Sequence, residues 1–489
     1  MSDKTFRGYF TRRSIGFFAG PLLFAILLMI PEPRGLEPEA WGVAAVALFM
    51  AVWWVTEAIP IPATALLPII LFPILDVGTV SDATKPFANP LIYLFMGGFI
   101  IAVAMEKTNL HKRVALTIIK KVGTKPHAII IGFMASAAFL SMWVSNTATA
   151  MMLLPIILSV IELVEEGKGE EDADLKTNFS IVLLLSLAYA CNIGGIATLI
   201  GTPPNAFMAG YMLDNYDVDI GFGQWMMVGL PLVIVALPLV YLMLTKVVYT
   251  VALKQLPGGE DLINNELEKA GAMTNPEKMV GCVFLLTAIL WITRPLLEPY
   301  IPNISDTGIA IFGALLMFLL PEDLAEMEFV LEWDDAKRLP WEVLILFGGG
   351  LSLAAGITDT GLADWIGESL GGLEFLPIIL LILLSLVVII FLTEVTSNTA
   401  TAAAFLPILA SVAVSMGYDP LMLVIPAAIG ASCAFMLPVA TPPNAIVFGS
   451  NLLSIPQMAK AGVVFNFLMV FVITIMLYLT VGFVFGVEF

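Results

Sequence analysis

Ser145-Asn146-Thr147-Ala148-Thr149-Ala150 interrupts a long apolar run, and the same six residues recur as Ser397-Asn398-Thr399-Ala400-Thr401-Ala402. Each copy is followed further along the chain by a Thr-Pro-Pro-Asn sequence, at Thr202–Asn205 and Thr441–Asn444. Two polar interruptions that recur in the same order indicate an internal repeat. These four segments decide how the rest of the chain is interpreted.

The composition predicts an all-α polytopic membrane protein. The chain has 489 residues, of which 59% are hydrophobic and 13% charged, and its mean hydropathy is +0.96. Many apolar runs approach the roughly 17–25 residues that cross a bilayer as a helix. Runs such as 378–392 are apolar on every face. A membrane β-barrel is therefore not expected, because its strands alternate apolar and polar residues.

Charge, cysteines and motifs exclude several classes of protein. The net charge is −18, but most acidic residues fall in loops such as 165–174 and 322–335, so the charge says little about a substrate. The three cysteines lie in apolar runs without CxxC spacing, which argues against a disulfide framework or a metal cluster. HExxH, GxSxG and GxxxxGK[ST] are absent from the sequence. We therefore expect no enzyme activity.

The chain divides into two similar halves. Residues 1–39 form an N-terminal segment whose apolar run, 15–30, follows basic residues and predicts a first helix with a cytoplasmic N-terminus. The first repeat is predicted at 40–253, a cytoplasmic linker at 254–278 and the second repeat at 279–489. A basic stretch at 107–125 is expected to form an amphipathic segment at the cytoplasmic surface.

The two hexads lie near the centres of apolar stretches at 126–164 and 376–416. Each stretch can be a single tilted helix, two crossings or a re-entrant hairpin. Non-helical backbone at membrane depth is tolerated only where it faces protein or a water-filled cavity, and three adjacent polar residues suit such a tip. If the hairpins do not cross the membrane, all but three of the 22 Lys and Arg lie on the cytoplasmic side; the three on the other side are Arg34, Lys85 and Arg294. The positive-inside rule favours this arrangement.

This arrangement predicts 11 transmembrane helices plus two re-entrant hairpins. The Thr-Pro-Pro-Asn sequences then break two further crossings, at about 179–211 and 421–447. An odd number of crossings in each repeat inverts the second copy relative to the first. Inverted repeats with broken helices place a binding site near the bilayer midplane.

The chemistry of the breaks favours a small anion together with Na⁺. Half-helices that start at Pro203 and Pro442 are expected to present free N–H groups and positive dipole ends, which attract anions. Uncharged donors are added by Asn146, Thr147, Thr202, Asn398, Thr399 and Thr441. Exposed carbonyls with Ser, Thr and Asn oxygens form a neutral cage suited to a hard cation. The competing interpretation is that these polar residues only join helices.

Three carboxylates fall in apolar surroundings, Glu57, Glu106 and Glu394, and intramembrane carboxylates are functional candidates. Glu394 lies three residues before Ser397. It either carries a proton or caps and orients the hairpin tip, and we favour the second role. Both histidines fall in or beside the basic stretch, so a histidine proton relay is not expected.

The sequence resembles the divalent anion/sodium symporter (DASS, INDY-like) family, and its dicarboxylate branch in particular. The resemblance rests on both Ser-Asn-Thr and both Thr-Pro-Pro-Asn sequences, on Trp53–Pro60 and on Thr393–Thr396. It implies a homodimer, with a scaffold and a transport domain in each protomer, that moves by an elevator mechanism. The implied first Na⁺ site consists of Ser141, Ser145, Asn146 and Gly201, and the second of Thr393, Thr396, Asn398 and Ala440. The implied substrate site consists of Asn146, Thr147, Thr202, Pro203, Asn398, Thr399, Thr441 and Pro442.

The resulting hypothesis is a secondary active transporter that couples Na⁺ to the symport of C4-dicarboxylates such as succinate, malate or fumarate. Co-transported sodium ions are expected, without an organic cofactor or a nucleic-acid partner. The expected location is the plasma (inner) membrane. The alternatives are a sodium-independent dicarboxylate exchanger, a sulfate or citrate symporter, a proton-driven antiporter that uses Glu394, and a channel.

Overall fold

The computed structural model describes residues 11–166, 173–253, 255–256, 258–323, 325–369 and 376–487. Lys4, Arg7 and most of the predicted loop at 165–174 lie outside these residues. Within them, ten helices are long and apolar enough to cross a membrane, and five shorter apolar helices accompany them. The expected all-helical polytopic architecture is thereby confirmed, while the count of 11 crossings and the inversion of the repeats stay predictions.

The helices of the first half follow one another with short connections. They are α1 (Arg12–Met29), α2 (Pro38–Thr56), α3 (Ile61–Thr64), α4 (Leu67–Ile74), α5 (Val80–Thr84), the 3₁₀ turn η1 (Lys85–Ala88), α6 (Pro90–Lys107), α7 (Leu110–Val122), α8 (Pro126–Ser141), α9 (Asn146–Glu166), α10 (Ala173–Gly194), the 3₁₀ turn η2 (Gly195–Ala197), α11 (Pro203–Tyr216), α12 (Phe222–Leu242) and the π-helical turn η3 (Met243–Val248).

The second half adds further helices and one short hairpin of strands. They are α13 (Gly259–Ala270), α14 (Asn275–Leu297), α15 (Asp306–Leu319), β1 (Pro321–Asp323), β2 (Glu328–Phe329), the 3₁₀ turn η4 (Trp333–Arg338), α16 (Trp341–Asp359), α17 (Leu362–Ser369), α18 (Ile378–Thr393), α19 (Asn398–Ser415), α20 (Leu421–Ala431), α21 (Pro442–Phe448) and α22 (Ile455–Phe485). The two strands pair antiparallel, with Pro321 opposite Phe329.

Proline marks the beginning of many helices. Pro90, Pro126, Pro203 and Pro442 each stand at the first position of a helix. The fixed φ of proline suits that position, and its missing N–H would have no partner within the helix there. The apolar runs of this sequence are thus cut into helices at defined residues.

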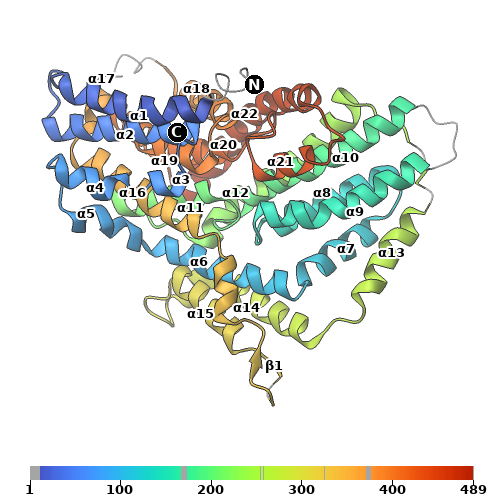
Figure 1. Cartoon of the computed structure of the whole chain (residues 1–489). Helices are drawn as coiled ribbons and strands as arrows, with labels where there is room; N and C mark the ends of the chain where they lie inside the picture. The colour runs from blue at the N-terminus through green and yellow to red at the C-terminus, as the bar shows by residue number, and fades with distance from the viewer. Residues whose placement is uncertain are drawn as a thin grey trace, which may run out of the picture.

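Helix α10 forms the centre of one side of the molecule. Its residues 179–194 are all buried inside the protein. It packs against α8, α9, α12 and α21, and Figure 1 shows α8, α9 and α10 together, with α21 beside α10. Helices α1 and α2 lie on the opposite side of the view, near α16 and α4. The hexads and the Thr-Pro-Pro-Asn sequences stand at the ends of helices in this assembly.

The predicted linker contains an amphipathic helix, α13, that the sequence analysis did not anticipate. It packs against α7, which forms the predicted amphipathic segment (Figure 1). Lys112 of α7 pairs with Glu266 at 2.9 Å, and Arg113 pairs with Glu277 at 2.8 Å. The Lys269 and Lys112 ammonium groups lower the pKa of the Glu266 carboxyl. Part of the basic stretch is therefore neutralised by the linker and by the start of α14.

Helices α6 and α15 approach closely at a glycine. A Cβ added to Gly97 would lie 2.7 Å from the carbonyl carbon of Ala310. Small residues let helix backbones approach within a membrane. The Gly-Gly pair of α6 is therefore a packing device, as its position inside an apolar helix indicates.

We expect Gly97→Ala to destabilise the protein, because the backbone of α15 must shift to admit the methyl group. Such overpacking costs about 1–3 kcal/mol. The measurement is the melting temperature of the purified protein in detergent, followed by intrinsic fluorescence. Gly42→Ala is the matched control, since a Cβ there would meet nothing nearer than Leu75 at 3.5 Å. Equal shifts in the two variants would contradict the packing role.

Candidate functional site

The first hexad forms a tip between two helices. Helix α8 ends at Ser141 and α9 begins at Asn146, with non-helical backbone between them. The Ser145 hydroxyl accepts a hydrogen bond from the Ala148 N–H at 3.2 Å, as an N-terminal cap does. Helix α8 lies so close to α10 that a Cβ on Gly194 would meet the Ala138 carbonyl oxygen at 2.4 Å. The tip is thereby held against the broken crossing of α10 and α11.

Oxygen atoms from the tip and from the broken crossing converge beside Gly195. A Cβ added there would lie 2.8 Å from the Gly201 carbonyl oxygen and 3.1 Å from Asn146 Oδ1. Asn146 Oδ1 is buried and has no hydrogen-bond partner among the described residues. A buried acceptor without a partner is costly. Neutral oxygens in such a group are the ligands that a hard cation takes.

Ser141 adds a further oxygen to this region. Its Oγ is buried and lacks a nitrogen or oxygen partner within the described part of the chain. The thiol of Cys191, a weak hydrogen-bonding group, lies beside it. Two of the four residues implied for the first Na⁺ site therefore carry side-chain oxygens that the protein itself leaves unsatisfied.

The first break is closed by Asn205. Its Nδ2 donates to the carbonyl oxygens of Thr198 at 2.8 Å and of Gly195 and Ile196, each at 3.3 Å. Trp225 Nε1 donates to the Ile196 carbonyl at 2.9 Å. These bonds satisfy backbone acceptors that no helix serves, so the shape of the break depends on Asn205, the last residue of Thr202–Asn205.

The second hexad forms a similar tip, but its oxygens bond to one another. Helix α18 ends at Thr393 and α19 begins at Asn398. The Thr393 hydroxyl lies 2.8 Å from Asn398 Oδ1 and 2.9 Å from the Ala431 carbonyl oxygen, with both as acceptors. The Thr396 and Thr401 hydroxyls form a hydrogen bond. The residues implied for the second Na⁺ site thus have partners within the protein.

Glu394 lies beside the second tip and is 3% exposed. Its carboxylate accepts hydrogen bonds from the backbone N–H groups of residues 435, 436 and 437 and from Asn466 Nδ2. These contacts join Glu394 to the segment before α21 and to α22, and the role favoured from the sequence, capping or orienting the hairpin tip, stays a prediction. Glu57, in contrast, is exposed, and Glu106 faces Arg338 at 3.6 Å.

The breaks of the two halves meet, although they are far apart in the chain. The Thr202 hydroxyl lies 3.2 Å from the Ser432 hydroxyl. Asn192 of α10 donates to the Thr441 hydroxyl at 3.1 Å and to the Ala434 carbonyl at 3.2 Å. The sequence analysis did not single out Asn192 or Ser432. The available signal was a polar residue inside an apolar run, which is weak when it stands alone.

The expectation of free N–H groups at the half-helix starts is wrong. Each start has two prolines, which carry no N–H. The next N–H is used within each start: that of Asn205 bonds to the Thr202 carbonyl, and that of Asn444 bonds to the Thr441 hydroxyl. Side-chain hydroxyls and amides must therefore provide most of the donors for an anion here.

The remaining predicted site residues differ in exposure. Thr399, Ala440 and Thr441 are buried, whereas Thr147 and Pro203 are half-buried and Pro442 is exposed. Each Thr-Pro-Pro-Asn segment bonds to the other half of the chain, Thr202 to Ser432 and Thr441 to Asn192. Asn146 and Asn398 make no direct hydrogen bond to each other among the described residues, so the arrangement of the two tips around one ligand stays a prediction.

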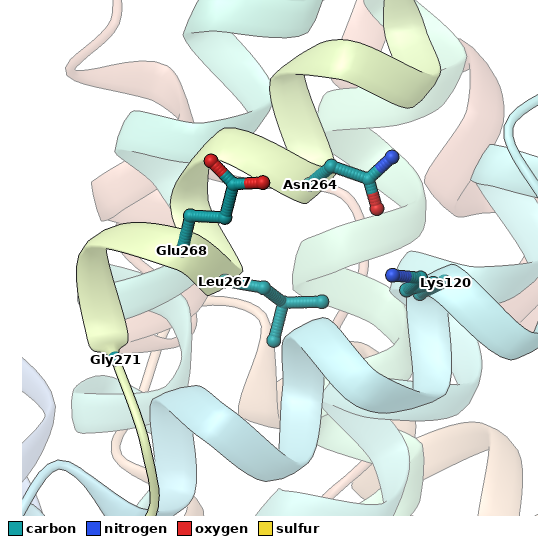
Figure 2. Close-up of a pocket in the computed structure, with 5 residues that line it drawn as sticks. All are labelled: Lys120, Asn264, Leu267, Glu268 and Gly271. Atoms are coloured by element: carbon teal, nitrogen blue, oxygen red, sulfur yellow. The ribbon is translucent and has the colours of Figure 1, made fainter.

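A separate cavity of about 600 Å³ lies between α7 and α13. Figure 2 shows Lys120 of α7 pointing toward Asn264 of α13, with Leu267, Glu268 and Gly271 completing the lining. None of these five residues belongs to a hexad or to a Thr-Pro-Pro-Asn sequence. We therefore place the candidate site at the breaks and not in this cavity.

Comparison with known proteins gives a consistent result over the full chain. Residues 13–486 match the family described as the sodium:sulfate symporter transmembrane region. A sodium-dependent dicarboxylate transporter, SdcS, of Staphylococcus saprophyticus is 44% identical over 492 residues, covering 100% of this chain and 95% of the relative. SdcS of Staphylococcus aureus (strain bovine RF122 / ET3-1) is 45% identical over 482 residues, covering 97% and 92%.

Two solved structures share the fold at low sequence identity. The YdaH transporter of Alcanivorax borkumensis aligns with a TM-score of 0.56 at 12% identity, covering 91% of this chain and 99% of that one. MtrF of Neisseria gonorrhoeae aligns with a TM-score of 0.59 at 13% identity, covering 94% of each chain. At such identities the likeness concerns the arrangement of helices alone.

We expect Asn205→Asp to destabilise the protein strongly, because a carboxylate of the same shape replaces three donated hydrogen bonds with repulsion between oxygens. Unsatisfied buried acceptors cost about 1–3 kcal/mol each. The melting temperature in detergent is the measurement. The matched control is Asn215→Asp on the same helix, which removes a single bond to the Tyr211 carbonyl at a half-buried position. A shift no larger than that of the control would contradict the role of Asn205.

Proposed function

Since the chain belongs to the sodium:sulfate symporter family, a family of transporters and not of enzymes, we propose that it moves C4-dicarboxylates across the membrane together with Na⁺. The observation that carries this proposal is the group of oxygens beside Gly195, in a chain that is 44–45% identical to sodium-dependent dicarboxylate transporters over nearly their full length. Succinate, malate and fumarate are the proposed substrates.

The first Na⁺ is proposed to bind at Ser141, Ser145, Asn146 and Gly201. The unsatisfied Ser141 Oγ and Asn146 Oδ1 support this assignment, as does the Gly201 carbonyl oxygen beside the same glycine as Asn146. A bound cation would satisfy acceptors that are otherwise buried without partners. The cation belongs to the cargo of the transporter, since Na⁺ moves with the substrate in the proposed cycle.

The second Na⁺ is proposed to bind at Thr393, Thr396, Asn398 and Ala440. The Thr393 hydroxyl donates toward Asn398 Oδ1 and the Ala431 carbonyl oxygen, and the Thr396 and Thr401 hydroxyls bond to each other. A cation can enter only if these hydroxyls turn their hydrogen atoms away from it, because a cation needs lone pairs. The first site is therefore the better prepared of the two in this conformation.

The dicarboxylate is proposed to lie between the tips, on Asn146, Thr147, Thr202, Pro203, Asn398, Thr399, Thr441 and Pro442. The hydrogen bond between Thr202 and Ser432 supports this placement because it brings the breaks of both halves together. Helix α11 directs its N-terminal dipole end to this region, and its start lacks a side-chain cap. Hydroxyl and amide donors would bind the carboxylates without a buried Arg.

An elevator movement of the two tips and both broken crossings as one body is also proposed. Bonds between the halves support it, namely those from Asn192 to Ala434 and Thr441 and from Tyr189 to the Phe435 carbonyl. The homodimer remains a prediction from the family resemblance, and the plasma (inner) membrane location remains a prediction from the sequence.

Uptake of radiolabelled succinate into proteoliposomes tests the transport proposal. We expect uptake to require an inward Na⁺ gradient and to proceed into vesicles without internal substrate, because symport needs no counter-substrate. Unlabelled sulfate and citrate are added as competitors, and whichever of them reduces succinate uptake identifies a further anion that the site binds. Uptake that occurs only into succinate-loaded vesicles and ignores Na⁺ would establish an exchanger and overturn the proposal.

Ser141→Ala tests the first Na⁺ site. We expect the Na⁺ concentration for half-maximal uptake to rise about tenfold, the effect of losing one ligand worth about 1.4 kcal/mol. The Michaelis constant for succinate at saturating Na⁺ should change much less. Ser159→Ala is the matched control, because Ser159 lies on α9 with its hydroxyl bonded to the exposed Pro155 carbonyl. An unchanged Na⁺ dependence in Ser141→Ala would exclude this residue as a ligand.

A further inference from the structure

Glu394 connects three parts of the second half that are distant in sequence. It directly follows α18 and reaches the residues between α20 and α21, as well as α22. Its Oε1 accepts from the Phe435 N–H at 2.7 Å and from Asn466 Nδ2 at 2.8 Å. Its Oε2 accepts from the Leu437 N–H at 3.1 Å, and the Met436 N–H lies 3.0 Å from both oxygens.

Every group that faces this carboxylate in those contacts is an N–H donor. An ionised carboxylate is an acceptor only, so it matches all of them. A protonated carboxyl group would direct its O–H toward one of these donors and lose at least one bond. Three consecutive backbone N–H groups and a buried amide thus all use the two carboxylate oxygens of Glu394 as acceptors.

The segment that Glu394 holds is also held from its other side. The Phe435 carbonyl accepts from the Tyr189 hydroxyl at 2.8 Å, and the Ala434 carbonyl accepts from Asn444 Nδ2 at 3.1 Å. Asn444 donates in addition to the Leu437 carbonyl at 3.1 Å. Both the N–H groups and the carbonyl groups of the break before α21 therefore have side-chain partners. Ala440 and Thr441 come shortly after this segment in the chain.

The first half has no counterpart to this carboxylate. Glu394 precedes Ser397 by three positions, and the residue that precedes Ser145 by the same spacing is Met142. The first break is fixed by neutral donors, Asn205 and Trp225, acting on its carbonyls. At these matching positions a carboxylate is thus present beside the second tip, next to Thr393, and is replaced by Met142 beside the first.

We propose that Glu394 is a positioning residue: its carboxylate holds residues 435–437 against α22 and so sets the affinity of the second Na⁺ site. The effect on Na⁺ affinity rests on the proposed function, whereas the clamp rests on the contacts of Glu394 with the break and with Asn466.

Labelling of Cys433 tests the clamp independently of transport. Cys433 is fully buried directly before the clamped segment, and Cys191 is fully buried in the first half. In a Cys282→Ser background, we expect Glu394→Gln to raise the rate of maleimide labelling at Cys433 about tenfold, because the substitution weakens the clamp by about the free energy of one charged hydrogen bond. Mass spectrometry identifies the labelled residue, and protection of Cys191 shows that the fold persists.

Sodium dependence of uptake tests the second part of the inference. We expect Glu394→Gln to raise the Na⁺ concentration for half-maximal uptake about tenfold, and Glu394→Asp to recover part of this loss. Glu57→Gln is the matched control, since it removes an equal charge from an exposed carboxylate. Wild-type Na⁺ dependence in Glu394→Gln, or unchanged protection of Cys433, would overturn the proposal.

Two results separate this inference from the proposed function and from unfolding. If the unmodified protein shows no Na⁺-dependent uptake, the proposed function fails, while the labelling of Cys433 still decides the clamp. If Glu394→Gln exposes Cys191 as well, the variant is unfolded, and Asn466→Ala takes its place because it removes one donor and keeps the carboxylate. Unchanged Cys433 protection in Asn466→Ala would then reject the clamp.

Discussion

Backbone polar groups released by a helix break must find partners, because the hydrocarbon core of a membrane offers no water. Buried side chains meet this requirement here. Asn205 and Asn444 donate to the carbonyls of the two breaks, and Glu394 accepts from N–H groups of the second. Asn192 of α10 donates to the Thr441 hydroxyl in the other half. Among the oxygens left without a partner in the described part of the chain are Ser141 Oγ and Asn146 Oδ1, which are available to a ligand.

Binding and support are therefore divided between different residues. The Nδ2 groups of Asn205 and Asn444 donate to backbone carbonyls, whereas Asn146 Oδ1 and Asn205 Oδ1 have no partner among the described residues. The role of each amide atom therefore follows from whether it already has a partner. At the second tip, the Thr393 hydroxyl donates to Asn398 Oδ1, so the oxygen of this asparagine already has a partner in this conformation.

The sequence was sufficient to locate the breaks, because Ser, Asn, Thr and Pro stand out in apolar runs. It also located helix starts such as Pro126 and Pro203. It could not reveal the partners of Glu394, since Asn466 and residues 435–437 approach it only through tertiary packing. Helix α13 was missed because its sequence is polar, as that of a loop is. Its contacts with α7, such as the ion pair between Lys112 and Glu266, appear only in the folded structure. The error about free N–H groups was avoidable, since proline has none.

Met142 stands in the first half where the second half has Glu394, so the two halves are no longer interchangeable. Two copies of one ancestral unit can be exchanged only while each supports its own break unaided. Here the first copy relies on neutral amides and the second on a carboxylate that needs Asn466 of the last helix. The halves have become complementary parts, so a chain assembled from two first halves would lack the charge that distinguishes one tip from the other.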